Sequence, residues 1–417
     1  MSGSAPILLF LSQTFVPDPA AVGQQTADVA IEMARRGQAV RVYAAANGYD
    51  DPSLRYPLRE NLHGVDVRRL RFASFGKRSI PVRIFGTLTF MSQCLLRALF
   101  TRNLAAVFVS TSPPLISAIG VLVARLRGVP VCYWAMDLNP DQLIAMGKIG
   151  PTSLSARCLE AINRWVLRQA DLVIALDRFM AERLEQRADL GGRLLTTPPW
   201  PHDNHLEPIP AEPNPFREKH GLTDKFVIMY SGNHSPANPL DTLLEAAVAF
   251  KDDPTLRFVF VGGGIGKKSV DAFIRDRQIS AAMSLPYQPI DELRYSLPAA
   301  DVHLVSLGQE MAGIVHPCKI YGAMSAGRPV LYLGPRPSHI TDLLDRRSFG
   351  WWVEHGDVRG AVKVLEAIRS TPRQRLEEMG RTGNELLRDS LTQQQLCGRV
   401  CDRLEEMIRR GRERKSA

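Results

Sequence analysis

The strongest constraint on the fold is an alternation of short apolar runs with segments of helical periodicity. Ile7–Ser12 and Val40–Ala45 are apolar almost throughout, and between them Gln25–Arg36 has apolar residues at helical spacing and stops at Gly37. Strands that are apolar along their whole length are buried on both faces, which is typical of parallel sheets covered by helices. Residues 1–200 are therefore predicted to form an α/β domain with a doubly wound, Rossmann-like sheet.

A proline-rich stretch then interrupts this pattern. Residues 196–216 read TTPPWPHDNHLEPIPAEPNPF and have no periodicity, which is typical of an interdomain linker. The alternation restarts at Phe226–Ser231 and continues through Val302–Ser306, so residues 215–388 predict a second domain of the same kind. A chain of 417 residues suits two domains. Two such sheets are expected to face each other across a ligand cleft at their carboxyl edges.

Composition excludes several other classes of protein. The chain is 45% apolar and 23% charged, as in ordinary globular proteins, and its apolar stretches fall short of the ~18 residues that a membrane span requires. No basic leader precedes the first apolar run, so no signal peptide is expected. The six cysteines include no Cys-x-x-Cys pair, which favours reduced thiols in a cytoplasmic protein over a zinc site.

One segment combines positive charge with large apolar residues. Arg68–Arg102 contains no Asp or Glu, although the whole chain has a net charge of +9. This interleaving predicts an anionic membrane surface as a partner, and a protein peripheral to the inner face of the cytoplasmic membrane. A solvated face over a core helix is the alternative, and no recognised module supports nucleic acid. The eight cations are Arg68, Arg69, Arg71, Lys77, Arg78, Arg83, Arg97 and Arg102.

Two loops of the second half contain residues suited to phosphate. Val261–Ser269 is rich in glycine, but Lys267 stands where a dinucleotide fingerprint or a P-loop needs glycine. That loop is a permissive turn, or else its amides or Lys267 lie near a phosphate. Tyr230–Asp241 predicts a strand-to-helix turn with Asn238 as the helix N-cap and Pro239 at the first helical position. His234 in this second loop could hydrogen-bond a phosphate at the helix N-terminus.

The stretch Glu310–Gly327 is the most informative. A helix is expected to begin near Pro317, and Gly327 stands where a C-cap glycine belongs. Lys319 then lies in the first turn, where a cation opposes the helix dipole. This unfavourable placement is explained if Lys319 neutralises a bound diphosphate; a solvated surface lysine is the alternative.

In the first half, two residues are candidates for ligand contact. Asp137 follows the apolar strand that ends near Tyr133, at the edge where ligands bind in such sheets, although it could instead cap the next helix. Gly23 in the opening loop would permit a close approach of the backbone to a ligand, or serve a plain turn.

These motifs together resemble glycosyltransferase family four, which has the GT-B fold, and in particular the branch that builds O-antigens and exopolysaccharides. The most specific motifs are His316–Gly322 (HPCKIYG) and Ala326–Pro329 (AGRP). The others are Gly23, Thr111–Pro114 (TSPP), Trp134–Pro140 (WAMDLNP), Tyr230–Asn233 (YSGN), Leu240–Glu245 (LDTLLE) and Ala299–Val302 (AADV). The resemblance covers nearly the whole chain.

The resemblance implies that the second domain binds a nucleotide-sugar, most often a UDP-sugar, and that the first domain binds the acceptor. It also implies transfer with retention of configuration, without a metal or other cofactor, and a C-terminal helix (390–410) that returns to the first domain. The acceptor would be a glycan or a polyprenyl-diphosphate-linked glycan. A sugar-nucleotide epimerase and a non-catalytic nucleotide-sugar-binding or assembly protein are the alternatives on the same fold.

Some residues depart from the family signature. The positions of its two glutamates are occupied by Ile314 and Gly322. Many members have histidine before Asp137, where this chain has Met136. An Arg and a Lys are usual after the first strand of the second domain, where this chain has Asn233 and His234. Glu310 is therefore the candidate for the missing carboxylate. The chain has no Asp-x-Asp, the usual metal-diphosphate clamp. The expected catalytic residues are Asp137, Glu310 and Lys319, and the expected donor-binding residues are Gly23, Gly232, Asn233, His234, Tyr287, Gln288, Glu310, Gly313, Ile314, His316 and Lys319.

Overall fold

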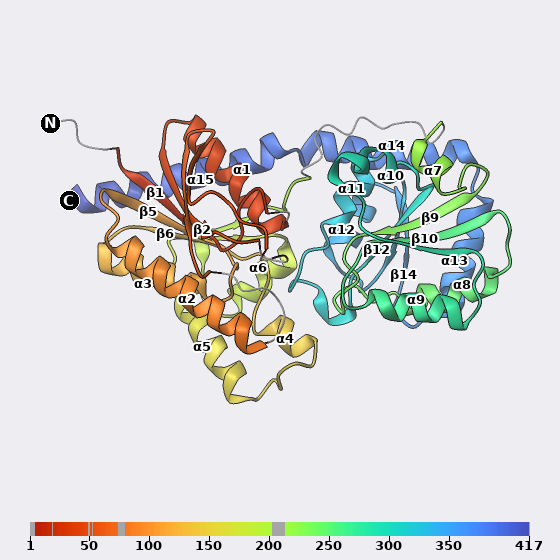
Figure 1. Cartoon of the computed structure of the whole chain (residues 1–417), viewed down its shortest axis with the longest axis horizontal. Coiled ribbons are helices and arrows are strands. Elements are labelled where there is room, and N and C mark those ends of the chain that lie inside the picture. Colours follow the sequence, from red (N-terminus) through yellow and green to blue (C-terminus); the bar gives the residue numbers. More distant parts are fainter. Residues whose placement is uncertain are drawn as a thin grey trace. The chain divides into compact units, whose positions relative to one another are not determined.

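The computed structural model describes residues 5–18, 20–48, 51, 53–73, 80–201 and 213–416. The chain forms two compact units (Figure 1). The first comprises Met1–Trp200 together with Gln393–Ala417, and the second comprises Pro201–Thr392. Part of the proline-rich stretch, residues 202–212, lies outside the described residues.

The first unit is built on an eight-stranded sheet in the order β3-β4-β2-β1-β5-β6-β7-β8. All neighbouring strands pair in parallel except β3, which runs antiparallel to β4 at the edge. The edge strand β3 was not predicted, because its sequence RENL has no apolar run. The strands are β1 (Ile7–Leu11), β2 (Ala39–Ala45), β3 (Arg59–Leu62), β4 (Val65–Leu70), β5 (Leu104–Val109), β6 (Val131–Trp134), β7 (Leu172–Ala175) and β8 (Leu194–Thr196).

Helices link these strands and cover the sheet. They are α1 (Ala21–Arg35), α2 (Ile80–Leu99), α3 (Ile116–Arg127), α4 (Asp141–Ala145), α5 (Leu154–Gln169) and α6 (Arg178–Glu185). The inner strands are buried on both faces, as the continuous apolar runs predicted, with Leu8, Phe10, Val107 and Phe108 fully enclosed. Gly128 closes α3 in the left-handed conformation.

The second unit has a six-stranded, fully parallel sheet in the order β11-β10-β9-β12-β13-β14. The strands are β9 (Phe226–Ser231), β10 (Leu256–Val261), β11 (Ala282–Leu285), β12 (Val302–Ser306), β13 (Val330–Leu333) and β14 (Gly350–Val353). The helices are α7 (Pro215–Lys219), α8 (Asp241–Ala247), α9 (Lys267–Asp276), α10 (Leu293–Ser296), α11 (Lys319–Ser325), α12 (His339–Arg346), α13 (Val358–Ser370) and α14 (Arg373–Ser390). The predicted doubly wound architecture is therefore present in both units.

The C-terminal helix α15 (Gln393–Ser416) belongs to the first unit, as predicted. It contacts α1, β5 and β7. Its apolar residues at helical spacing, Leu396, Val400, Leu404 and Ile408, are all buried. Burying an aliphatic side chain contributes about 1.5–3 kcal/mol, so this helix is an integral part of the first core. No helix among the described residues is long and apolar enough to cross a membrane.

Candidate active site

The strand order of the second sheet reverses between β9 and β12, which is where ligands bind in open parallel sheets. The turns that follow these strands meet here. The Oγ of Ser306, the last residue of β12, donates to the carbonyl of Pro239, and the Gly308 amide donates to the carbonyl of Ala237 at 2.8 Å. The sequence-predicted donor residues after β9 therefore lie at the topological switch point of this sheet.

Lys319 is the central cation of this edge. Its Nζ lies 5.4 Å from the centre of the Tyr230 ring, and burial lowers its pKa to about 8. Among the residues that the structure describes, no carboxylate forms an ion pair with it. A desolvated cation without a counter-ion is poorly stabilised, and a bound anion would supply what is missing. Lys319 therefore differs from an ordinary surface lysine, whose ammonium group is fully solvated.

Glycines allow the two phosphate-suited turns to interlock. Val261 pairs with Ser231, so the turns after β10 and β9 begin side by side. A Cβ atom on Gly262 would lie 2.0 Å from the Gly232 carbonyl oxygen, and one on Gly264 would lie 2.1 Å from Asn233 Oδ1. Both glycines also have positive φ, +130° and +111°. The glycine-rich turn after β10 therefore packs directly against the backbone of Gly232 and the side chain of Asn233.

His234 lies within this interlock. It is 2% exposed, its amide donates to the Gly263 carbonyl at 2.7 Å, and its ring meets Tyr230 edge to face at 4.9 Å. Burial, reinforced by Lys267, lowers its pKa to about 4, so the ring is neutral at pH 7. Its Nε2 is buried and has no hydrogen-bond partner among the described residues. Its Nδ1 lies 3.3 Å from the Gly263 carbonyl oxygen, which can only accept, so the single proton of the neutral ring lies on Nδ1 and Nε2 is an acceptor. A hydrogen bond from His234 to a phosphate stays a prediction.

Lys267 has a structural role. Its Nζ donates to the carbonyls of Phe260 at 2.6 Å and Leu285 at 3.0 Å, which ties the ends of β10 and β11 together. Of the two alternatives for the glycine-rich loop, this geometry favours the plain turn. Two lysines that look alike in sequence, Lys267 and Lys319, thus have different surroundings: the first is held by main-chain carbonyls and the second is not.

The loop after β11 presents an aromatic ring at the same edge. Tyr287 is 57% exposed, and a Cβ atom on Gly263 would lie 2.8 Å from its ring. Gln288 is half-buried, and its Nε2 donates to the Pro286 carbonyl at 3.0 Å. An exposed ring backed by glycine is a surface on which a flat base can stack.

The segment between β12 and α11 places the remaining predicted residues. Glu310 is exposed in a 3-10 turn, Gln309–Met311, and Gly313 has φ +70°. Ile314 is 3% exposed and belongs to the core. Its side chain therefore does not replace the carboxylate that the family has at this position, whereas Glu310 has an unburied one nearby.

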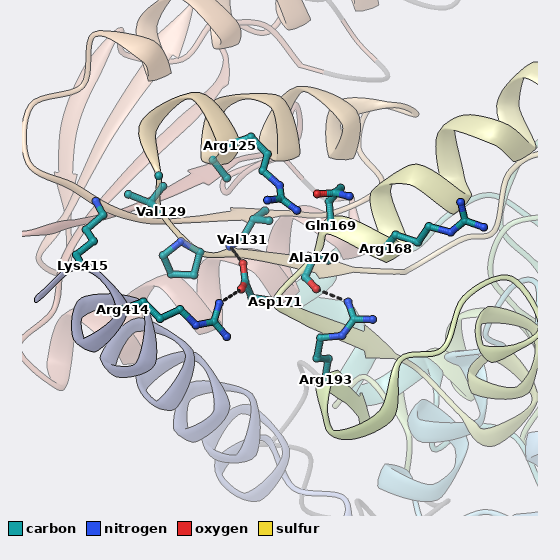
Figure 2. A pocket seen from close by; sticks show the side chains of 14 residues that line it. Arg125, Val129, Val131, Arg168, Gln169, Ala170, Asp171, Arg193, Arg414 and Lys415 are labelled. Carbon is teal, nitrogen blue, oxygen red and sulfur yellow. Dashed lines mark hydrogen bonds and ion pairs between the residues drawn. The ribbon is translucent and has the colours of Figure 1, made fainter. Parts of the chain in front are cut away.

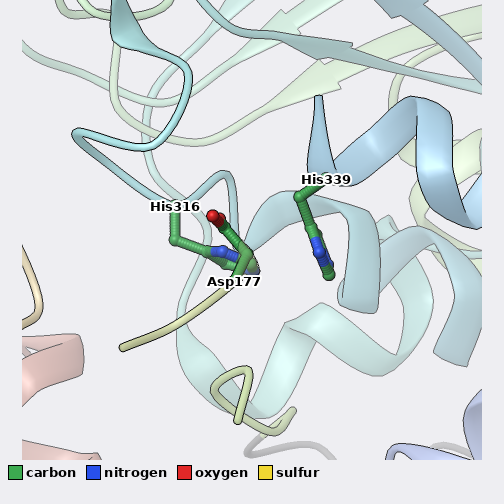
Figure 3. Close-up of side chains that lie close together, drawn as sticks. All are labelled: Asp177, His316 and His339. Carbon is green, nitrogen blue, oxygen red and sulfur yellow. The ribbon is translucent and has the colours of Figure 1, made fainter. Parts of the chain in front are cut away.

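The sequence analysis missed a hydrogen-bonded network around His316. The hydroxyl of Tyr321 lies 2.8 Å from His316 Nε2 and 3.0 Å from His339 Nε2. The two histidine rings are neighbours, with centroids 4.3 Å apart (Figure 3). Because Tyr321 lies on α11 two residues after Lys319, this network orients the start of that helix. His339 follows the helix N-cap Ser338, and nothing in its local sequence indicates a link to His316.

Helix boundaries near the site differ from those predicted. The helix after β9 begins at Asp241, with Leu240 rather than Asn238 as its N-cap. The Asn238 side chain instead donates to Ser235 Oγ at 3.0 Å within the turn. Helix α11 begins at Lys319 itself, and the predicted glycine at its C-terminal end, Gly327, has φ +64°.

In the first unit, Asp137 follows β6 at the carboxyl edge. Burial raises its pKa to about 6. It does not cap the next helix: α4 has Pro140 as its N-cap and no side-chain cap. The indole Nε1 of the neighbouring Trp134 and the Thr111 hydroxyl are buried without hydrogen-bond partners among the described residues. Unpaired buried polar groups, and an acid whose pKa is raised by burial, are both features of functional sites.

Gly23 differs from its prediction in one respect. It lies within the first turn of α1, not in a loop. A Cβ atom there would lie 3.0 Å from the Phe15 amide nitrogen, so glycine lets α1 pack closely on the turn after β1. A contact with the donor stays a prediction.

Two doubly wound α/β units, a C-terminal helix that returns to the first unit, and a desolvated cation at the switch point of the second sheet together define a glycosyltransferase of the GT-B fold. Family models agree with this class. The "Glycosyl transferase 4-like domain" matches residues 20–200, and "Glycosyl transferases group 1" matches residues 214–385. The chain therefore belongs to glycosyltransferase family four.

Individual relatives are consistent with this assignment. The chain is 24% identical over 308 residues to "Probable glycosyltransferase WbjE" of Pseudomonas aeruginosa, covering 73% of this chain and 76% of the relative. It is 27% identical over 220 residues to "Putative colanic acid biosynthesis glycosyl transferase WcaI" of Escherichia coli strain K12, covering 52% and 54%. The second match spans about half of either protein.

Solved structures share the fold. HepE of Anabaena, determined in complex with UDP and glucose, superposes with a TM-score of 0.72 at 15% identity, over 96% of this chain and all of that one. Sucrose-phosphate synthase of Thermosynechococcus elongatus gives a TM-score of 0.75 at 14% identity, over 97% and 99%. At this level of identity the similarity concerns the architecture.

Proposed function

We propose that the protein transfers a sugar from a nucleotide-sugar, in the first instance a UDP-sugar, to a glycan or lipid-linked glycan in bacterial surface polysaccharide synthesis. The observation that carries the proposal is Lys319, a half-buried, desolvated cation without an ion-pair partner among the described residues, at the switch point of the second sheet. The name of the relative WcaI, a putative colanic acid biosynthesis glycosyl transferase, supports the polysaccharide context, and HepE, crystallised with UDP and glucose, supports the donor class.

In this proposal, Lys319 neutralises the diphosphate of the donor. The bond between the anomeric carbon and the diphosphate oxygen breaks, and negative charge grows on the leaving group. A cation fixed in a desolvated site stabilises that charge without reorganisation, which is an efficient form of catalysis. The Asn233 amide, which donates to no other described residue, adds a hydrogen bond. The exposed Tyr287 ring stacks against the base.

We further propose that transfer retains configuration and needs no divalent metal. The acceptor hydroxyl attacks the face that the diphosphate leaves, and its proton passes to a leaving phosphate oxygen, so a strong protein base is not required. The absence of an Asp-x-Asp from the sequence supports neutralisation by a side chain rather than by a metal. Asp137 is proposed to hydrogen-bond the acceptor, since its raised pKa keeps a proton available near pH 6.

Membrane attachment through α2 is the proposed route to a lipid-linked acceptor. Phe90, Cys94 and Ala98 form the buried face of α2, whereas Phe85, Leu88 and Leu96 are more than half exposed. The exposed residues follow helical spacing on the opposite side, where a helix on the surface of a soluble protein is normally polar. Arg83 and Arg97 on the same helix are exposed. An amphipathic surface of this kind suits an anionic bilayer.

The charge of the predicted basic segment is smaller than its sequence suggested. Arg68 forms an ion pair with Asp66 at 3.0 Å, and Arg69 is buried against Glu60. Lys77 and Arg78 lie outside the described residues. Four cations of the segment are exposed: Arg71, Arg83, Arg97 and Arg102.

The proposal is tested by screening the purified protein against UDP-, GDP- and ADP-sugars, with thermal shift for binding and nucleotide release for turnover. Lys319→Ala should weaken donor binding at least tenfold, because a hydrogen bond to a charged group contributes about 1.5–3 kcal/mol. Lys268→Ala, an exposed lysine of α9, is the matched control. Initial rates should not change with excess EDTA.

Each other outcome has a definite meaning. Donor binding without nucleotide release in the presence of lipid-diphosphate acceptors would indicate a non-catalytic binding protein. A new sugar-nucleotide formed without acceptor would indicate an epimerase. Failure of every nucleotide-sugar to bind, or equal affinity of Lys319→Ala and the parent, would overturn the proposal for this site.

A further inference from the structure

A second charged site lies in the first unit, at the opposite end of the strands from Asp137. A cavity of about 440 Å³ opens at the amino ends of β6 and β7. Its walls come from the C-terminal ends of α3, α5 and α15 and from the turn before β8 (Figure 2). Since Asp137 follows the carboxyl end of β6, this cavity is separate from the candidate acceptor site.

The lining is strongly cationic. It contains Arg125, Arg168, Arg193, Arg414 and Lys415, against a single carboxylate, Asp171. The carboxylate is already neutralised: its Oδ2 accepts from the Val131 amide, and its Oδ1 accepts from Arg414, both at 3.0 Å (Figure 2). The cavity therefore has a surplus of positive charge.

Part of this charge has a structural purpose, and part does not. Arg193 donates to the carbonyls of Leu167 at 3.0 Å and Ala170 at 2.6 Å, and so completes the end of α5. By contrast, Arg125, Arg168 and Lys415 have no hydrogen bond or ion pair with any residue that the structure describes. All three are exposed.

Helix dipoles do not account for this grouping. A cation in the last turn of a helix is favourable, which explains Arg125 on α3 and Arg168 on α5 individually. However, Arg193 already bonds the last carbonyls of α5, and Lys415 approaches from a third helix that begins after the second unit. Like charges from three separate helices repel one another unless an anion lies between them.

Exposed apolar side chains lie on and beside α3, the helix that contributes Arg125 to the cavity. Leu122 is exposed and lies on the same face of α3 as Arg125, because residues three or four apart share a helix face. Arg127 donates to the carbonyls of Leu99 and Thr101, which holds Phe100, 82% exposed, beside the end of α3. A phosphate-binding cavity with exposed apolar side chains on one of its helices matches the boundary between headgroups and acyl chains.

We propose that this cavity binds phosphate groups, through Arg125, Arg168 and Lys415, and that their source is the headgroup of an anionic lipid. Guanidinium groups bind phosphate oxygens in pairs, and a lysine adds a compact charge. The lipid source rests on the proposed membrane attachment, whereas the phosphate site itself does not. A soluble phosphate compound is the other source of the same chemistry.

The experiment compares the full-length protein with Arg125→Ala/Arg168→Ala/Lys415→Ala. The matched control is Arg359→Ala/Lys363→Ala/Arg381→Ala, which removes three exposed cations from the second unit. Calorimetry measures binding of inorganic triphosphate. Co-sedimentation measures binding to phosphatidylcholine vesicles with and without phosphatidic acid at about one lipid in five. Donor binding by each variant, measured in parallel, should be unchanged.

We expect the cavity variant to lose at least tenfold in affinity for triphosphate and for the anionic vesicles, while the control keeps both. Loss of triphosphate binding alone, with vesicle binding intact, would support the phosphate site and assign it to a soluble ligand. Equal binding of both probes by the parent and the cavity variant would overturn the proposal. Because donor binding is read separately, this failure is distinguishable from a failure of the proposed transferase function.

Discussion

A Cβ atom on Gly232 would lie 2.4 Å from Cε of Lys319. The stem of the lysine therefore crosses directly over the backbone of the turn after β9, through space that a methyl group would fill. The two residues are far apart in sequence, and their contact fixes where the lysine ammonium group lies. Gly232 also has φ +141°, a conformation that other residues rarely adopt.

Gly232→Ala should therefore damage the site more than the fold. We expect donor affinity to fall at least tenfold, because the new methyl group displaces Lys319. Gly356→Ala is the matched control, because this glycine also has a positive φ, +87°, but a Cβ atom added to it would have no neighbouring atom within 4 Å. Both variants should lose about 1–3 kcal/mol in unfolding free energy from backbone strain. Donor titration and chemical unfolding measure the two effects, and a Gly232→Ala protein with normal donor affinity would contradict the role given to this contact.

The lowered pKa of Lys319 predicts how stability depends on pH. Its folded pKa, about 8, lies below the ordinary value of 10.5, so between these values the unfolded chain holds a proton that the folded chain does not. Stability gained from this group is present above pH 10.5 and is lost as pH falls through 8. Lys319→Met should therefore be more stable than the parent at pH 7, with a difference that shrinks from pH 8 upward. A donor diphosphate favours the charged lysine, so donor affinity of the parent should decline above pH 8.

Asp137 should show the opposite dependence. Its pKa of about 6 exceeds the ordinary 3.8, so its contribution to stability is full below pH 3.8 and is lost as pH rises through 6. Asp137→Asn should lack this loss and unfold at a higher temperature at pH 7, while turnover falls at least tenfold. Thermal unfolding across pH 4–7 and initial rates would check both. Full turnover by Asp137→Asn would show that the Asp137 carboxyl group has no role in the reaction.

The C-terminal helix should be required for the stability of the first unit. Leu404 is fully buried, and replacing such a leucine with alanine costs about 2–5 kcal/mol. Truncation after Asp389 removes all of α15 and should expose the first unit to protease, although the deleted residues lie at the other end of the chain. Arg409→Ala, an exposed position on the same helix, should behave like the parent. Unchanged protease resistance of the truncated protein would contradict the crossover.

The exposed stripe on α2 should control membrane binding. Phe85→Ser/Leu88→Ser/Leu96→Ser should abolish co-sedimentation with anionic liposomes while leaving the melting temperature within a few degrees, because these side chains already face solvent. Arg83→Glu/Arg97→Glu should weaken binding chiefly at low salt, since such attraction is screened within about 10 Å at 0.1 M. If the parent ignores anionic liposomes at low salt, the stripe is not a membrane surface and the acceptor is soluble.

Local sequence determined the elements of both sheets. The runs at Phe226–Ser231 and Val302–Ser306 match β9 and β12 residue for residue, because a strand buried on both faces needs apolar side chains at most positions. Helical spacing likewise identified α1, which begins four residues before the predicted Gln25. The same rule could not find β3, whose RENL sequence is held at the sheet edge only by pairing with β4.

Tertiary structure decided which of these residues form a site. Sequence presented Lys267 and Lys319 as similar candidates, and only the packed turns show that strand carbonyls hold the first while the second stays desolvated and without an ion pair in the described chain. The link from His316 through Tyr321 to His339 was invisible for the same reason. Periodicity acts over a few residues, whereas contacts between side chains depend on strand register and turn geometry, which bring together segments that the chain keeps apart.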